Sequence, residues 1–118
     1  MKKPVHVVHI LPTLAVGGAE RAVINLINAS DPTRVRYSII VLFDKRPLEQ
    51  ALLPGRASVF VVQKTSLVGW GLIRRLTQLL GTLAPDVVHT HLFSPDVWGR
   101  MAAKKLHLPV VTTEHNIN

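Results

Sequence analysis

The chain has 118 residues, of which 47% are hydrophobic and 18% charged, a composition typical of a globular α/β domain and too apolar for a disordered one. It contains no cysteine, which excludes disulfides and cysteine-based metal or redox chemistry. Its net charge of +7 favours anionic partners, but aromatic residues make up only 5% and do not alternate with the basic ones, so we expect no nucleic-acid-binding surface.

No export or membrane-spanning segment is expected. Basic residues open the chain, but the apolar run after them is short, carries His6 and His9, and ends at Pro12. No apolar segment approaches the roughly 20 residues that cross a bilayer. Together with the absence of cysteine, this predicts a cytoplasmic protein.

Five apolar runs alternate with segments of helical periodicity. The predicted strands are Val5–Leu11, Tyr37–Phe43, Ser58–Val62, Val87–Thr90 and Val110–Thr113, and the predicted helices are Ala19–Ala29, Leu48–Leu53, Leu67–Leu83 and Pro95–Leu106. Strands that are apolar throughout indicate a parallel sheet covered on both faces. We therefore predict one domain over residues 1–118, with a doubly wound, Rossmann-like α/β sheet in the order 3-2-1-4-5.

The first strand runs through Gly17 and Gly18 into a helix. Two glycines let a backbone approach a ligand closely, and the helix start offers unpaired N–H groups with partial positive charge. Phosphates bind at such places, so the junction predicts a nucleotide or sugar-phosphate site. The alternative is a tight turn with Gly18 near the N-cap.

Polar residues also occur where the fourth and fifth strands end. In doubly wound sheets, ligands bind beyond the carboxyl ends of the strands, where the strand order reverses, here between strands one and four. The residues expected to bind substrate there, beside the glycine pair, are Thr90, His91, Glu114, His115 and Asn116. Purely structural roles for the histidines, and a solvated loop at Glu114–Asn116, remain alternatives.

Within His89-Thr90-His91, we expect the two histidines on opposite faces of the strand, one packed into the sheet and the other directed into the crevice. A zinc site would need a third ligand, for which His115 is the candidate. With so poor a ligand set, no metal site is predicted.

Two other segments have functional alternatives. Asp44 follows strand two, where nicotinamide-binding folds place a ribose-binding acid, but no third glycine follows Gly17 and Gly18. The segment Leu67–Leu83 carries an apolar stripe that is expected to cover the sheet. Its tryptophan beside Arg74 and Arg75 is also compatible with a lipid headgroup surface.

Three motifs in this order resemble those of the retaining, GT-B-type glycosyltransferases of family 4. They are GGAER at Gly17–Arg21, PDVVHTH at Pro85–His91 and TEHN at Thr113–Asn116. The intervening Leu92–Ala103 is similar to that family's helix after strand four.

The resemblance implies the acceptor-side domain of a two-domain enzyme that uses a nucleotide sugar and a glycan or lipid-linked acceptor, in cell-surface polysaccharide synthesis in bacteria. Gly17 and Gly18 would approach the donor diphosphate, His91 would contact the transferred sugar or the acceptor, and His115 would line the same cleft. It implies front-face transfer with retention, in which the leaving diphosphate helps to deprotonate the acceptor and no metal or other cofactor is bound.

The resemblance also implies a donor-binding domain outside these 118 residues, so we expect the chain alone to be inactive. Two alternatives from other classes remain. One is a stand-alone module that binds nucleotides or sugar phosphates. The other is a basic peripheral membrane module, whose binding to anionic lipid would depend on Arg74 and Arg75.

Overall fold

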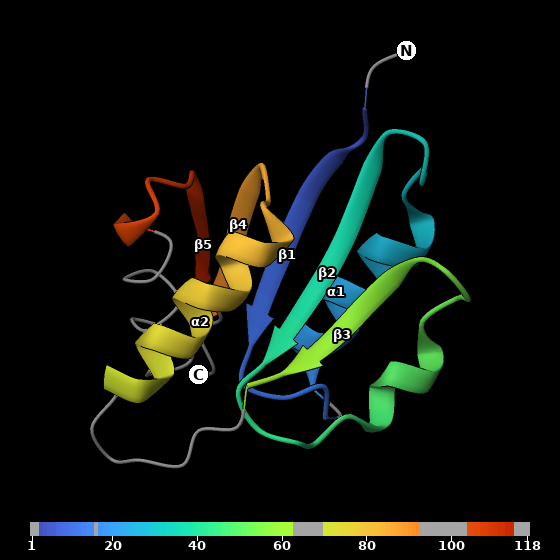
Figure 1. Cartoon of the computed structure of the whole chain (residues 1–118). Helices are drawn as coiled ribbons and strands as arrows, with labels where there is room; N and C mark the ends of the chain where they lie inside the picture. The colour runs from blue at the N-terminus through green and yellow to red at the C-terminus, as the bar shows by residue number, and fades with distance from the viewer. Residues whose placement is uncertain (1–2, 16, 63–69, 93–103, 115–118) are drawn as a thin grey trace.

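The computed structural model describes residues 3–15, 17–62, 70–92 and 104–114. Strands and helices alternate along the chain (Figure 1). In order they are β1 (Val5–Leu11), α1 (Gly18–Ala29), β2 (Val35–Val41), the 3-10 helix η1 (Pro47–Ala51), β3 (Ala57–Val61), α2 (Trp70–Leu83), β4 (Val87–Leu92) and β5 (Val110–Glu114).

The five strands form one parallel sheet in the order β3-β2-β1-β4-β5, which confirms the predicted topology. β1 lies at the centre, with β2 and β3 on one side and β4 and β5 on the other. The strand order therefore reverses between β1 and β4, and the carboxyl ends of both strands reach the same edge. In the register of this pair, His9 lies opposite His89 and Ile10 opposite Thr90.

Among the described residues, α2 packs against one face of the sheet and α1 against the other, as Figure 1 shows with α2 in front and α1 behind. On the α2 side, buried strand residues such as Val8, Ile10 and Ile40 pack with Leu76 and Leu80 of the helix. The α1 side has its own cluster, whose buried members are Leu11, Leu14, Val23, Ile24, Ile27, Tyr37, Ile39 and Val41. The central strands β1 and β2 are therefore largely buried on both faces, whereas β3 is half-buried and Val111 of β5 is exposed.

The stripe predicted for the third helix is confirmed for the part of it that the structure describes. Leu72, Ile73, Leu76 and Leu80 are buried against the sheet, while Arg74 and its neighbour Arg75 are exposed. The predicted start at Leu67 lies outside the described residues. After Leu83 the chain leaves the helix through Ala84, which has a positive φ of 47°.

Some predicted boundaries differ from the structure. β2 begins at Val35, two residues earlier than expected, and ends at Val41, because the N–H groups of Leu42 and Phe43 turn to the Pro12 carbonyl. The short helix expected at Leu48–Leu53 is the 3-10 helix η1. Most of the helix predicted at Pro95–Leu106 lies outside the described residues.

Candidate functional site

The loop after β1 is fixed to the loop after β2, at the carboxyl edge of the sheet. The N–H of Leu14 donates to the carbonyl of Lys45 (2.7 Å), and the N–H of Leu48 donates to the carbonyl of Leu14 (2.9 Å). The side chain of Leu14 is fully buried. Backbone bonds and burial together therefore fix the chain just before the glycine pair.

Gly17 is the N-cap of α1 and Gly18 its first residue. Gly17 is extended, with φ −171°, a conformation open to any residue, so backbone strain does not require glycine there. A Cβ at Gly17 would instead collide with the carboxylate of Glu20, whereas a Cβ at Gly18 would meet open space. Glu20 is buried in the first turn of α1, where the helix dipole stabilises a negative charge.

Three histidines of β1 and β4 gather on the α1 face of the sheet. His9 is adjacent to His89 in the strand register, and His91 lies two residues further along β4. The expectation that His89 and His91 lie on opposite faces is wrong: their rings stack with centroids 4.3 Å apart. The physical reason is the two-residue period of a strand, which puts residues i and i+2 on the same face.

Short contacts join these histidines to each other and to β5. The Nδ1 of His9 lies 3.0 Å from the Nε2 of His91, so an N–H of one ring donates to the bare nitrogen of the other. The Nε2 of His89 lies 2.6 Å from the Oγ1 of Thr113. On its other side, His9 stacks on Tyr37, with ring centroids 5.6 Å apart. The aromatic and polar row thus runs across four neighbouring strands.

Burial determines the charge of His9, which is 1% exposed. Desolvation, with smaller contributions from the neighbouring His91 and His89, lowers the pKa of His9 to about 3. His9 is therefore neutral at physiological pH. Its Nε2 is buried and has no hydrogen-bond partner among the residues that the structure describes.

The other predicted site residues are placed as follows. Thr90 is fully buried and lies opposite Ile10, a member of the core on the α2 side, so its side chain is on the other face from His91. Glu114 is the last residue of β5, and its backbone pairs with Leu92 at the carboxyl edge. His115 and Asn116 lie outside the described residues.

The family described as Glycosyltransferase Family 4 matches residues 16–118, which is most of the chain. The chain belongs to glycosyltransferase family 4. A search of curated proteins and a search of solved structures each return no match. Membership in a glycosyltransferase family implies a sugar donor and an acceptor as substrates. The Rossmann-like α/β sheet agrees with this assignment, and the match includes all three motifs of the sequence analysis.

In this family 4 glycosyltransferase chain, the sequence analysis missed His9 and Glu20 as residues of the candidate site. The two-residue period of β1 could have indicated His9, because it places His9 on the same face as Leu11. The predicted strand order also places β1 beside β4, where His9 lies opposite His89. Glu20 carries no comparable signal, because the position of its carboxylate against Gly17 depends on the tertiary packing of α1.

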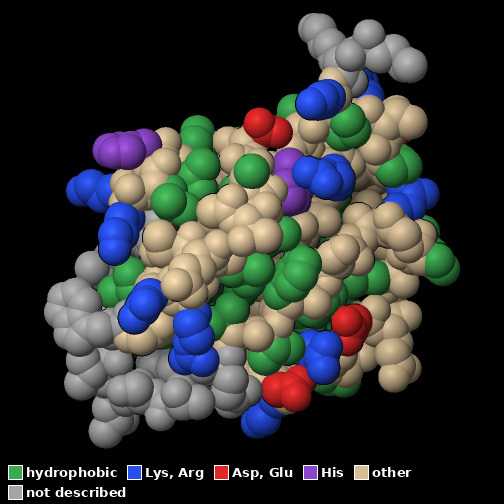
Figure 2. Space-filling view, viewed as in Figure 1, with side chains coloured by type: hydrophobic (Ala, Val, Ile, Leu, Met, Phe, Trp, Pro, Cys, Tyr) green, Lys and Arg blue, Asp and Glu red, His purple; other side chains and the backbone are tan. Residues whose placement is uncertain are grey.

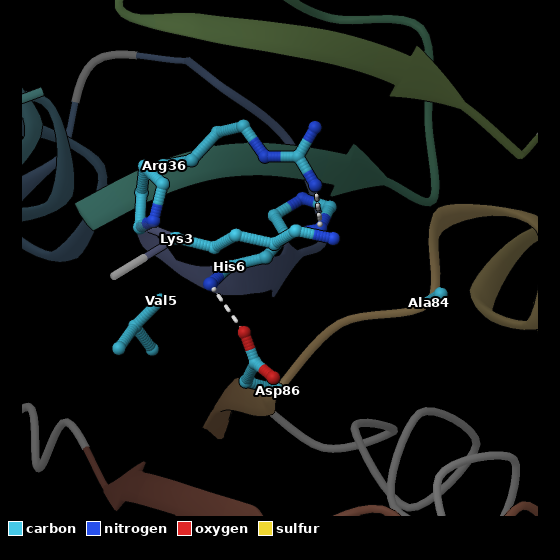
Figure 3. Close-up of a pocket in the computed structure, with 7 residues that line it drawn as sticks. Lys3, Val5, His6, Arg36, Ala84 and Asp86 are labelled. Carbon is cyan, nitrogen blue, oxygen red and sulfur yellow. Dashed lines mark hydrogen bonds between the residues drawn. The ribbon is translucent and has the colours of Figure 1, made fainter. Parts of the chain in front are cut away.

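A cavity of about 620 Å³ lies at the opposite, amino-terminal edge of the sheet (Figure 3). There the backbone N–H of His6 donates to Asp86 (2.8 Å) and Arg36 donates to the His6 Nδ1 (3.0 Å). The His6 Nε2 lies 2.8 Å from the Ser38 Oγ, and the His6 Nδ1 also lies 3.1 Å from the Leu83 carbonyl oxygen. These bonds connect β1, β2 and the start of β4. Because ligands of doubly wound sheets bind at the carboxyl edge, this cavity is not the candidate active site.

Figure 2 shows the charged side chains on one face of the molecule. Lys and Arg side chains are spread around this face and form no single dense patch. Asp44, the residue that a nicotinamide site would use, accepts a hydrogen bond from the Nε of Arg46 (2.8 Å). In the part of the chain that the structure describes, α1 and α2 are too short or too polar to span a bilayer.

Proposed function

We propose that the native protein transfers a sugar from a nucleotide-sugar donor to a glycan or lipid-linked acceptor, with retention of anomeric configuration. The match to family 4 over residues 16–118 carries this proposal. It is supported by the topology, because the strand order reverses between β1 and β4, and the residues proposed for the site follow or end these strands.

Gly17 and Gly18 are proposed to bring backbone N–H groups of α1 to the donor diphosphate. The first amides of a helix have no partner within the helix, and the dipole favours negative charge there. At Gly18 the space around the Cα is open, so a ligand can come close to the backbone. The carboxylate of Glu20 already lies against Gly17, which leaves Gly18 as the more accessible of the two.

His91 is proposed as the catalytic residue that contacts the transferred sugar or the acceptor. It is 4% exposed, so only a small part of the ring is available to a ligand. The neutral His9 beside it contacts its Nε2 at 3.0 Å and so holds the orientation of the ring. Such a pair positions and hydrogen-bonds a hydroxyl; it is not a strong base.

Glu114, His115 and Asn116 are proposed as further substrate-binding residues at the same edge, with Thr90, predicted as a fourth, supporting them from within β4. Charged, imidazole and amide groups can together orient a polyhydroxylated ligand. In this scheme the leaving diphosphate accepts the acceptor proton, and catalysis needs positioning and charge stabilisation without a metal or other cofactor. Because Thr90 is fully buried, its contribution would be to hold the end of β4 in place.

We further propose that this chain is the acceptor-side domain of a larger cytoplasmic enzyme that builds a cell-surface polysaccharide in bacteria. The net charge of +7 suits acceptors that carry phosphates or lie on an anionic membrane. The intact mass of the native polypeptide tests the domain assignment. A mass near 13.0 kDa, or turnover of a nucleotide sugar by the 118-residue chain alone, would contradict it.

The reaction itself is tested by incubating the native protein with nucleotide sugars and candidate acceptors. We expect release of a nucleoside diphosphate and a product whose anomeric configuration, read by NMR, matches that of the donor. Gly18→Leu should slow this transfer at least tenfold without loss of folding, because the new side chain enters open space beside α1. Transfer by Gly18→Leu at the wild-type rate would contradict the placement of the diphosphate.

The main alternative is a module that binds nucleotides or sugar phosphates without catalysis. The glycine pair at the start of α1 favours it, because anion binding there needs no second domain. Binding of a nucleoside diphosphate by the native protein, with no transfer to any acceptor tested, would support this alternative.

A further inference from the structure

The three histidines of β1 and β4 form a cluster with the composition of a metal site. His9, His89 and His91 each offer a ring nitrogen, and one such nitrogen from each lies within 4.8 Å of the other two. The expectation that no metal binds rested on a poor ligand set, with His115 as the candidate for a third ligand, and did not consider His9. His89 and His91 stack on the same face and His9 supplies a third ring, so that reason no longer holds.

We propose that His9, His89 and His91 together bind a divalent transition-metal ion of the zinc class. Imidazole suits zinc, copper and nickel, whereas magnesium and calcium prefer oxygen ligands. Three histidines also form the ligand set of some catalytic zinc sites, where water occupies a fourth position. This inference concerns binding by the described chain and does not depend on the proposed transfer reaction.

The nitrogen–nitrogen distance between His9 and His91 is close to the one that such an ion needs. Zinc–nitrogen bonds of about 2.0–2.1 Å at tetrahedral angles place ligand nitrogens roughly 3.4 Å apart. The His9 Nδ1 and His91 Nε2, now 3.0 Å apart, would separate only slightly. The rings of His89 and His91 are 16° from parallel, so one of them must rotate for the two lone pairs to converge on one ion.

Coordination requires no net loss of a proton from the histidine pair. In the structure, one N–H lies between the rings of His9 and His91. On binding, that proton moves to the other nitrogen of the donating ring, and both facing nitrogens then present lone pairs to the ion. Both histidines of this pair can therefore bind through the unprotonated ring nitrogens that metals require.

Two groups around the cluster favour a ligand. The Nε2 of His9 is fully buried and has no partner among the described residues, so no hydrogen bond from them at that nitrogen holds the ring against the small movement that binding through Nδ1 needs. Thr113 contacts the Nε2 of His89 at 2.6 Å and can orient that ring as a supporting residue. Such hydrogen bonds to ligating histidines tune metal affinity.

Cobalt(II), a spectroscopic substitute for zinc, provides the test on the metal-free native protein. We expect one equivalent to give the intense visible absorption of a tetrahedral site, and zinc to remove it by competition. His89→Ala should abolish the signal, whereas His107→Ala, a change at an exposed residue, should retain it. Thr113→Val should weaken zinc binding about tenfold or more, because it removes the support of His89.

Absence of the tetrahedral signal in the wild-type protein would overturn the proposal, and so would its retention in folded His89→Ala. If His89→Ala does not fold, NMR of the histidine ring nitrogens in the wild-type protein tests the proposal instead. Zinc must then shift the signals of His9, His89 and His91, and unchanged signals would overturn the proposal. These measurements read binding alone, so failure of the transfer reaction would not affect them. If His91 also serves the substrate, one equivalent of zinc should inhibit transfer.

Discussion

His9 acts on the candidate site through His91. Its ring lies between Tyr37 and the β4 histidines, and its Nδ1 is 3.0 Å from the His91 Nε2. A residue of this kind positions another and does not touch substrate. Its loss should therefore affect the rate of the chemical step more than substrate binding.

His9→Phe tests this role, because phenylalanine preserves the stacking on Tyr37 and removes the hydrogen bond to His91. We expect kcat of the native protein to fall about tenfold, the equivalent of one hydrogen bond of about 1.4 kcal/mol, with little change in KM. Tyr37→Phe is the matched control, since it preserves the stacked ring and loses only the contact with Ser30. An unchanged kcat in His9→Phe would show that His9 does not position His91.

At the scale of elements, the strands and their order were predictable, because runs of apolar residues on both faces admit few arrangements other than a parallel sheet. Val5–Leu11 has the predicted bounds. The site was less predictable. That His89 and His91 share a face follows from the strand period, whereas the carboxylate of Glu20 against Gly17 and the loop bonds of Leu14 depend on tertiary packing that no local pattern encodes.

The end of α2 gives a prediction that depends only on backbone geometry. Ala84 has a φ of 47°, and its N–H donates to the Leu80 carbonyl (2.9 Å), an arrangement in which helices usually place glycine. Ala84→Gly should raise the free energy of unfolding by about 0.5–1 kcal/mol, because it removes the steric cost of the side chain. Gly81→Ala, inside the same helix and facing open space, should also stabilise the protein by a similar amount.

Urea unfolding of each variant measures both effects. A loss of stability in Ala84→Gly would mean that the left-handed conformation of residue 84 is wrong. The two changes run in opposite chemical directions, so a shared gain cannot come from a general preference for alanine or for glycine.

At the scale of the whole molecule, the two edges of the sheet have different polar networks. The carboxyl edge carries the histidine cluster and the glycine pair, whereas the amino-terminal edge carries His6 with Arg36 and Asp86 (Figure 3). Burial and the Arg36 guanidinium lower the pKa of His6 below its usual 6.5, although the Leu83 carbonyl and Asp86 act in the opposite direction. The free energy of unfolding should therefore depend on pH through His6 at the amino-terminal edge.

Because the folded state disfavours protonation of His6, the stability that this residue contributes is complete above the unfolded-state pKa near 6.5. It is lost as the pH falls from there toward the lower pKa of the folded state. Urea unfolding of wild type and His6→Gln should therefore show a smaller decline between pH 7.5 and 5.5 in the variant. Equal declines would show that His6 has no part in the pH dependence.

The central proposal for the whole molecule is a glycosyltransferase site at the carboxyl edge of the sheet, between β1 and β4. The most direct test is the rate of sugar transfer by the native protein with His91→Ala, compared with His107→Ala at an exposed position. We predict that His91→Ala loses at least a hundredfold in kcat/KM while remaining folded, and that His107→Ala transfers at the wild-type rate. Transfer by folded His91→Ala at the wild-type rate would contradict the placement of the site.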